Sequence, residues 1–308
     1  MDIPVAGQVL VLVILMAIGF LSYKLKITNR EASGYFSSFV LKITLPCLIL
    51  SSFQRPYSRE LLGEAGATLG IGFAVYVFSF LLSLAYPYLL GMKGPERGVH
   101  RYALFIPNSG LVGFPVIEAV MGPFYLFHAS LFNIPSHILA FSIGIWIIAK
   151  ESGGSSAFSW KMFINPLIIC TIAGFFMFIF SVSLPAPLEK SIAFAGNMTT
   201  PLSMAVIGIT IAQAKIRQML GYWRVYVTVF TRLLLLPALI LLVCVLLGAK
   251  GPLLALPVII AATPAGSTTS ILASVYKVAE EEAGAIVALS TVLCAITIPL
   301  VVFAVHCF

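Results

Sequence analysis

Charged residues are scarce in this sequence, and their scarcity excludes a soluble protein. Of the 308 residues, 9% are charged and 60% are hydrophobic, and the mean hydropathy is +1.06. Soluble domains carry about 25% charged residues, so this chain has too little charge to cover a water-facing surface. Because backbone polar groups in lipid must be satisfied within the chain, the composition predicts an all-α integral membrane protein.

Cysteine and basic N-terminal residues are also scarce. The five cysteines are odd in number, and Cys47, Cys170, Cys244 and Cys294 lie inside apolar segments. That spacing excludes a disulfide framework and a cysteine metal site. Only Asp2 precedes the first apolar run as a charged residue, so no cleavable signal peptide is expected.

Several functional motifs are absent. The sequence contains no Gly-x-x-x-x-Gly-Lys-Ser/Thr loop, the signature of phosphate binding by nucleotide-driven proteins. It also lacks paired carboxylates, histidine clusters and Ser/His dyads at usable spacing. We therefore expect no enzyme, no cofactor and no metal. The net charge of +7 would suggest a nucleic-acid partner for a soluble chain. Here the distribution of the basic residues among the loops explains the charge, and no nucleic-acid partner is expected.

Ten segments are apolar enough to span a bilayer, which takes about 20 residues. The longest polar connection, 150–161 with Ser152-Gly-Gly-Ser-Ser156, lies in the middle and divides the chain into halves 1–150 and 151–308. The expected spans are 4–22, 32–54, 66–90, 99–121, 124–149, 163–182, 187–213, 222–247, 252–276 and 283–305.

The distribution of basic residues predicts the orientation. With the N-terminus outside, twelve of the eighteen lysines and arginines fall on one side and four on the other, while Lys42 and Arg232 lie within spans. Basic residues collect on the cytoplasmic side. The sequence therefore predicts a multi-pass protein of the cell membrane with both termini extracytoplasmic.

The two halves resemble each other. At an offset of 155 residues Gly19-Phe20 matches Gly174-Phe175 and Thr44-Leu-Pro46 matches Thr199-Thr-Pro201, and at 156 Asn108-Ser-Gly110 falls on Pro264-Ala-Gly266. Five spans per half is an odd number, so the second half runs opposite to the first. This pattern predicts two inverted five-helix repeats, a common plan of transporters.

Two spans are interrupted at their centres. The first break, Pro107 to Pro115, holds two prolines and two glycines, and the second is Ala262-Thr-Pro-Ala-Gly-Ser-Thr-Thr269. Proline removes a backbone donor and glycine leaves helical geometry cheaply. A break in lipid persists only where it is buried in protein or lines a water-filled cavity. Paired breaks in corresponding halves indicate a transporter's binding site.

The breaks predict an anion site. Residues 111–121 form about 16 Å of helix at 1.5 Å per residue, so each break falls near the membrane midplane. Each second half-helix begins there with free N–H groups and a positive dipole end, which favours a carboxylate. The candidate binding residues are Pro107, Asn108, Ser109, Gly110, Gly113, Pro115, Pro264, Gly266, Ser267 and Thr268.

These residues resemble the signatures of the auxin efflux carrier family, which includes the plant PIN proteins and bacterial members. Asn108, Gly113 and Pro115 precede Gly122, and Pro264-x-Gly266 precedes Ala273-x-x-Tyr276. The resemblance covers all ten spans. It implies that helices 4 and 9 cross at their broken centres. The residues that match the family's crossover residues are Pro107, Asn108 and Pro264. The short central connection is similar to that of prokaryotic members.

The resemblance also implies a domain division and a substrate class. Helices 1, 2, 6 and 7 would form a scaffold domain, and helices 3–5 and 8–10 a mobile transport domain that moves like an elevator. Substrates of the family are organic anions, namely auxin in plants and malate- or malonate-type dicarboxylates in bacteria.

Isolated polar residues inside spans need a reason, because a charge at a helix centre costs about 2.5–3.5 kcal/mol on insertion scales. Glu118 is either a proton or cation relay or an interfacial residue. Lys42 either snorkels to the cytoplasmic face or attracts the anion, and Arg232 is expected in an ion pair, with Glu118 as one candidate partner. Asn133 is a candidate to line the cavity, and His137 for coupling.

The sequence predicts a secondary transporter of small mono- or dicarboxylates or auxin-like acids, working by alternating access. A sodium-dependent symporter of the bile-acid type and a membrane sensor that binds the same ligand remain as alternatives. Proton and sodium coupling both stay open. Gly66-x-x-x-Gly70 permits close helix contact, expected within the protomer, with a homodimer as the alternative.

Overall fold

The computed structural model describes residues 5–151, 165–214 and 222–305. Within these ranges the chain is helical, and the exception is one isolated β-bridge. Residues 152–161 of the expected central connection 150–161, and the basic residues Lys215 and Arg217, lie outside the described residues.

Seven helical stretches of the described residues are long and apolar enough to cross a membrane. They are Gly7–Lys24, Arg30–Ser52, Arg59–Leu89, Pro123–Lys150, Ala186–Gln213, Trp223–Leu246 and Glu280–Val305, and the shorter apolar helices are Ser109–Met121, Pro166–Ile179 and Pro252–Ala261. These bounds lie close to the spans expected from hydropathy, and the two interrupted spans account for Ser109–Met121 and Pro252–Ala261.

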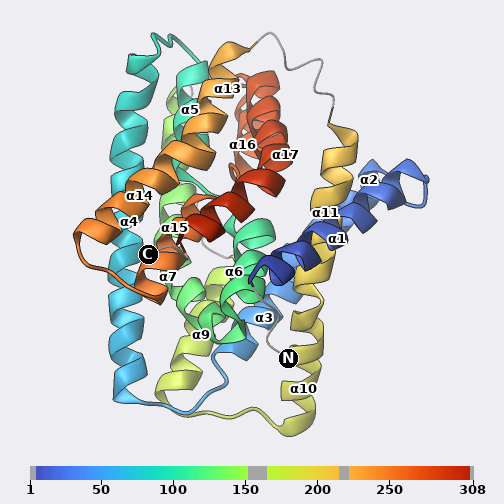
Figure 1. Cartoon of the computed structure of the whole chain (residues 1–308), viewed down its shortest axis with the longest axis vertical. Coiled ribbons are helices and arrows are strands. Elements are labelled where there is room, and N and C mark those ends of the chain that lie inside the picture. The colour runs from blue at the N-terminus through green and yellow to red at the C-terminus, as the bar shows by residue number, and fades with distance from the viewer. Residues whose placement is uncertain (1–4, 152–164, 215–221, 306–308) are drawn as a thin grey trace. The chain divides into compact units, whose positions relative to one another are not determined.

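The helices and the π or 3₁₀ turns, labelled η, follow in chain order (Figure 1). They are α1 (Val5–Lys24), α2 (Arg30–Phe39), η1 (Val40–Thr44), α3 (Leu45–Ser52), α4 (Arg59–Leu89), α5 (Glu96–Phe105), η2 (Ser109–Gly113), α6 (Phe114–Met121), η3 (Pro123–Tyr125), α7 (Leu126–Leu139), η4 (Ala140–Gly144), α8 (Ile145–Glu151), α9 (Pro166–Ile179), α10 (Ala186–Asn197), α11 (Thr199–Gln213), α13 (Trp223–Phe230), η6 (Thr231–Leu235), α14 (Leu236–Leu246), α15 (Pro252–Ala261), α16 (Thr268–Tyr276) and α17 (Glu280–Val305).

Three of the π turns directly precede a proline. Pro46, Pro115 and Pro237 stand in the first turn of α3, α6 and α14, immediately after η1, η2 and η6. A proline ring clashes with the carbonyl one turn earlier and provides no N–H. The wider π turn accommodates both defects without ending the span.

The chain forms two compact units. The first consists of Met1–Gly70, Gly110–Ile134 and Phe163–Gln213, and the second of Ile71–Ser109, Pro135–Met162 and Ala214–Phe308. Each unit therefore draws on both halves of the sequence.

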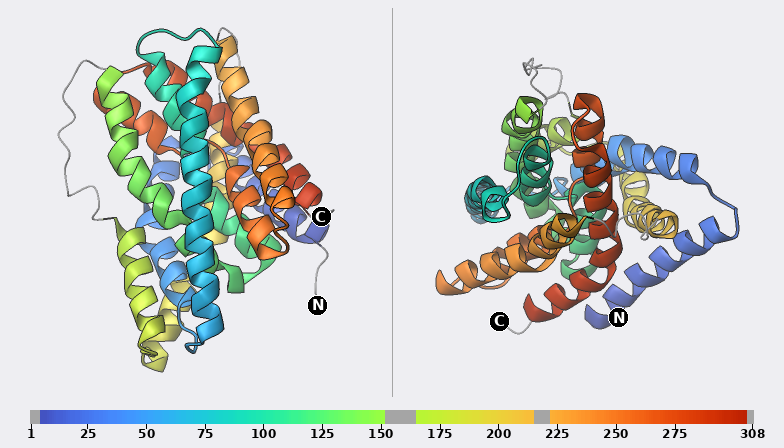
Figure 2. Two further views of the ribbon diagram at one scale, coloured as in Figure 1. Left: turned by 90° about the vertical axis from the view of Figure 1, so that its left-hand side faces the viewer. Right: turned by 90° about the horizontal axis from the view of Figure 1, so that it is seen from above.

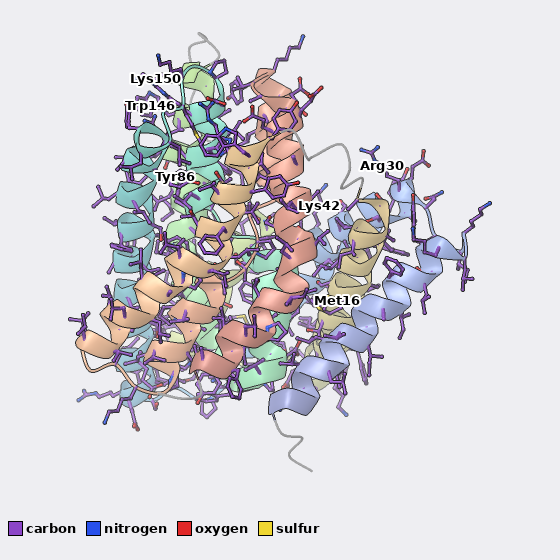
Figure 3. The ribbon with its side chains drawn as sticks, turned by 45° about the horizontal axis from the view of Figure 1, so that its top comes forward. Met16, Arg30, Lys42, Tyr86, Trp146 and Lys150 are labelled. Atoms are coloured by element: carbon purple, nitrogen blue, oxygen red, sulfur yellow. The ribbon has the colours of Figure 1, made fainter. Side chains whose placement is uncertain are left out.

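In the first unit, α1 packs against α11 over much of its length (Figure 1). The contact is close because it contains two glycines, one on each helix. A Cβ atom at Gly19 would overlap the backbone of Ala205, and one at Gly208 would overlap the carbonyl oxygen of Met16. Figure 3 labels Met16 on α1 beside α11. Small residues of this kind allow helix backbones to approach each other in a membrane protein.

In the second unit, α13, η6 and α14 continue as one helix, drawn in orange in Figure 2. One apolar core of this unit includes Phe105, Ile148 and Leu272, and another includes Leu236 and Val258. These cores pack α5, α15 and α16, which flank the two breaks, together with α8 inside the unit.

The close contact expected at Gly66 and Gly70 is not found. In the described structure, a Cβ atom at either glycine would have open space around it. Small residues permit close packing but do not require it, and close backbone contacts occur instead at Gly19, Gly208 and Gly196.

Candidate functional site

The two breaks pair with each other inside the second unit. The amide of Asn108 donates to the carbonyl of Pro264 (2.9 Å), and the amide of Gly266 donates to the carbonyl of Ile106 (3.0 Å). These bonds form one antiparallel β-bridge. Each break thus satisfies backbone groups that the other exposes, which is what an interruption inside a membrane requires. We call this paired segment, 106–108 with 264–266, the crossover.

Polar side chains surround the crossover. The amide nitrogen of Asn108 donates to the hydroxyl of Ser267 (3.3 Å), and the hydroxyl of Tyr102 donates to Thr268 (3.0 Å). The hydroxyl of Ser290 accepts from the backbone at the centre of the second break (3.2 Å). Asn108, Ser267 and Thr268 were expected here. Tyr102 in α5 and Ser290 in α17 were missed, because both lie outside the breaks, where the local sequence shows nothing unusual.

Arg232 holds the C-terminal ends of both first half-helices. It is 2% exposed, and its Nη1 donates to the carbonyl of Leu104 at the end of α5 (2.7 Å). Its Nε donates to the carbonyl of Thr263 after α15 (3.2 Å). A cation is favourable at a helix C-terminus, where carbonyls lack intrahelical partners. Its Nη2 is buried and has no hydrogen-bond partner among the described residues.

Arg232 and Glu118, expected as a candidate ion pair, each have other partners within their own unit. Glu118, on α6 in the first unit, accepts a hydrogen bond from the hydroxyl of Thr200 on α11. Backbone carbonyls accept hydrogen bonds from the buried charge of Arg232 and stabilise it. Sequence patterns show which residues are charged, but backbone acceptors at helix ends carry no residue-specific signal.

The other residues of the first break lie in η2 and at the start of α6. Ser109 is buried, Gly113 is the N-cap of α6, and Pro115 stands in its first turn. A Cβ atom at Gly110 would lie 2.8 Å from the side chain of Leu41. Gly110 therefore serves helix packing within the first unit as well as chain flexibility.

The remaining candidates have varied surroundings. Lys42 is exposed on η1 and is labelled in Figure 3. Asn133 is buried, and its side-chain amide donates to the carbonyl of Ala129 one turn earlier (2.8 Å). His137 is half-buried on the part of α7 that belongs to the second unit.

Two cavities also occur within the units. One of about 460 Å³ in the second unit is lined by apolar residues of α4 and α14, including Phe78 and Ile240, and offers nothing to an anion. One of about 380 Å³ in the first unit is lined by Arg55 and Glu189 among others. Burial lowers the pKa of Arg55. The carboxylate of Glu189 in the same wall also weakens the attraction of Arg55 for an anion.

The crossover is chemically suited to an anion. An amide and two hydroxyls lie at the start of α16, whose N-terminus carries positive partial charge. The buried guanidinium of Arg232 stands behind the same backbone. In a site of low dielectric these groups attract a carboxylate more strongly than they would in water.

Comparisons with known proteins agree on one class. A family described as "Membrane transport protein" matches residues 4–302. The "Putative malonate transporter" of Rhizobium meliloti is 22% identical over 305 residues, covering 96% of this chain and 93% of that protein. "Uncharacterized transporter YfdV" of Escherichia coli K12 is 21% identical over 306 residues, or 96% of each chain. "Uncharacterized transporter MJ1031" of Methanocaldococcus jannaschii is 22% identical, covering 87% and 88%.

Proposed function

Because this chain belongs to the membrane transport protein family of auxin efflux carrier-like transporters, we propose that it moves a small organic anion across the membrane as a secondary transporter. The carboxylate binds at the crossover. The observation that carries this proposal is the pairing of the two breaks, with the side chains of Asn108 and Ser267 in contact.

The substrate class is a mono- or dicarboxylate. The donors at the crossover are an amide and hydroxyls, which bind carboxylate oxygens, and Arg232 supplies a positive charge nearby. The name of the Rhizobium meliloti relative includes malonate, so malonate is the first acid to test. Malate and indole-acetate follow.

We also propose the architecture of two inverted five-helix repeats. Two contacts support it. Thr44 and Thr199, equivalent at an offset of 155, share a buried hydrogen bond of 3.0 Å, and Asn108 bonds to its equivalent Pro264. Repeats related by a twofold axis bring equivalent residues together where the axis passes. Helices 1, 2, 6 and 7 then act as scaffold, and helices 3–5 and 8–10 as a transport domain that moves like an elevator.

The remaining proposals concern setting and coupling. The chain lies in the cell membrane with both termini extracytoplasmic, as the distribution of basic residues predicts. A proton or sodium gradient drives net movement. Gly66 and Gly70, with open space beside them, are where a second copy would pack if the protein is a homodimer.

Counterflow in proteoliposomes tests the function. Vesicles are loaded with unlabelled malonate, malate, pyruvate or indole-acetate, and entry of labelled malonate is followed with and without sodium. Accelerated entry supports a carrier, and dependence on sodium supports the bile-acid-type symporter. Binding of an acid without exchange would support the sensor and contradict transport.

Replacing Asn108 with alanine should weaken substrate binding about tenfold to a hundredfold. A hydrogen bond to a charged group contributes roughly 1.5–3 kcal/mol, and the variant removes such a donor. Asn108→Asp, of nearly the same shape, should be worse because its carboxylate repels the substrate. Malonate dissociation constants and thermal unfolding of all three proteins are the measurements. Unchanged binding in well-folded Asn108→Ala would place the site elsewhere.

A further inference from the structure

A fully buried histidine lies away from the crossover in the second unit. His100 on α5 is 0% exposed. Its Nδ1 lies 2.6 Å from the hydroxyl oxygen of Thr228 on α13, and its Nε2 lies 2.9 Å from Oε2 of Glu282 on α17. The Thr228 hydroxyl also contacts the hydroxyl of Tyr86 on α4 (2.9 Å) and the carbonyl of Arg224 (2.9 Å). Residues of four helices are therefore connected in one network around the imidazole.

The His100 contact is the middle one of three between α5 and the α13–η6 helix. Glu96 forms an ion pair with Arg224, His100 contacts Thr228, and the carbonyl of Leu104 accepts from Arg232. Partners on both helices recur every four residues, which keeps them on one face of each helix. A change at His100 thus acts on α5 and on the α13–η6 helix, the same two helices that the contact between Arg232 and the Leu104 carbonyl connects.

Two arrangements of the hydrogens in this network differ by one proton, besides those in which Thr228 donates to the hydroxyl of Tyr86. The Thr228 hydroxyl has a single hydrogen, while the Arg224 carbonyl and Nδ1 of His100 both lie within its reach. When that hydrogen points to the carbonyl, Nδ1 must carry its own proton and donate to Thr228. When it points to Nδ1, the imidazole is neutral. In both states Nε2–H donates to Glu282.

The two states differ by one proton and no heavy-atom movement. Uptake forms the Nδ1–H bond of His100, and the Thr228 hydrogen turns to the Arg224 carbonyl. The His100–Glu282 pair changes from one negative charge to zero. Glu282 is 19% exposed and connects the pair to water, whereas His100 itself is sealed.

The neighbouring charges are already engaged. Glu96 and Arg224 pair with each other, and Arg97 and Arg101 donate to backbone carbonyls and lie over the ring of Tyr88. Glu281 accepts from Tyr222 (2.7 Å), which raises the pKa of Tyr222. Tyr86 and Thr228 reach the network as neutral hydroxyls, and Glu282 is the carboxylate that contacts the imidazole.

We propose that His100 and Glu282, with the Thr228 hydroxyl as the switch, form the proton-binding site that couples transport to the proton gradient. This inference rests on the proposed function. The neutral, protonated pair is the form in which α5 and the crossover move with the substrate, because an uncompensated negative charge in this buried site would be costly to carry through the membrane.

Histidine NMR tests proton binding without any transport. The protein has four histidines, so ¹⁵N-histidine labelling in detergent gives few signals, and His100→Gln assigns one of them. We expect His100 to gain a proton at Nδ1 as the pH falls from 9 to 5, with Nε2–H retained throughout. An imidazole that stays in one state over this range overturns the proposal.

Proton-driven accumulation tests coupling. With the membrane potential clamped, an inward proton gradient should drive substrate accumulation by about tenfold per pH unit for one proton per substrate, since a tenfold ratio corresponds to 1.4 kcal/mol. His100→Gln keeps a donor toward Glu282 but takes up no proton near neutral pH, so the pair keeps the negative charge and both counterflow and accumulation should be lost. Glu282→Gln makes the pair neutral without a proton, so it should retain counterflow and lose the response to the gradient. Thermal unfolding of both variants guards against a folding defect.

His128→Gln is the matched control. His128 also contacts a glutamate, Glu64, at 3.1 Å, but Glu64 is 49% exposed. Within the part of the chain that the structure describes, Nδ1 of His128 has no hydrogen-bond partner. It therefore lacks the hydroxyl switch, and its variant should accumulate substrate as the wild type does. Gradient-driven accumulation that persists in His100→Gln overturns the proposal. Absence of counterflow in the wild type would count against the proposed function, and NMR would then decide the proton site by itself.

Discussion

Replacing Arg232 with methionine is expected to destabilise the protein by roughly 2–6 kcal/mol and to abolish transport. The guanidinium donates to the carbonyls of Leu104 and Thr263, and both residues are buried in the second unit. Each acceptor left unsatisfied costs about 1–3 kcal/mol. Loss of the cation also removes a favourable charge from the ends of α5 and α15. Thermal unfolding in detergent and malonate counterflow measure the two effects.

Two further variants control this result. Lys42→Met removes an equal charge from an exposed position on η1 and should unfold close to the wild type. Arg232→Lys keeps the charge but not the planar set of donors, so it should fall between the wild type and Arg232→Met. If Arg232→Met unfolds like Lys42→Met, the two carbonyl contacts do not hold the crossover together.

Replacing Gly208 with leucine should be the most damaging packing change in the first unit. A Cβ atom at this position would overlap the carbonyl oxygen of Met16, which belongs to the backbone of α1 and cannot rotate away. The helices α1 and α11 must separate, and the loss should reach or exceed the usual overpacking range of about 1–3 kcal/mol. We expect a fall in thermal stability and in the yield of monodisperse protein.

The same substitution on α2 provides the control. A Cβ atom at Gly34 would meet nothing within 4 Å, and Gly34 is exposed. Gly34→Leu should therefore be neutral or slightly stabilising, because glycine costs about 0.8–1.0 kcal/mol relative to alanine inside a helix. Equal stability of Gly208→Leu and Gly34→Leu would contradict the close crossing of α1 and α11.

The positions of the breaks could be predicted because proline and glycine act locally. Pro107, Gly110 and Pro264 exclude regular helix wherever they occur in an apolar span, and the structure ends α5 and α15 next to them. The crossing of the two breaks was what the resemblance to the auxin efflux carriers implied. The direct backbone bonds between Asn108 and Pro264 were beyond such an argument.

The close contact between helices was predicted at the wrong glycines. Gly66 and Gly70 form a recognisable motif, yet open space surrounds them. Gly19 and Gly208 belong to no such motif and make a close contact. A glycine motif describes one helix surface, whereas a close contact needs the matching surface of a second helix.

The sequence by itself determined that this chain is an α-helical membrane protein, where its spans lie and where two of them break, since hydropathy, proline and glycine act within a few residues. Only the tertiary structure decided the partners of the buried polar groups. Arg232 contacts backbone 128 and 31 residues away, and His100 meets Thr228 and Glu282 across 128 and 182 residues. Such partners are chosen by packing, because a buried polar group must find its hydrogen bonds among whatever groups the fold brings near it.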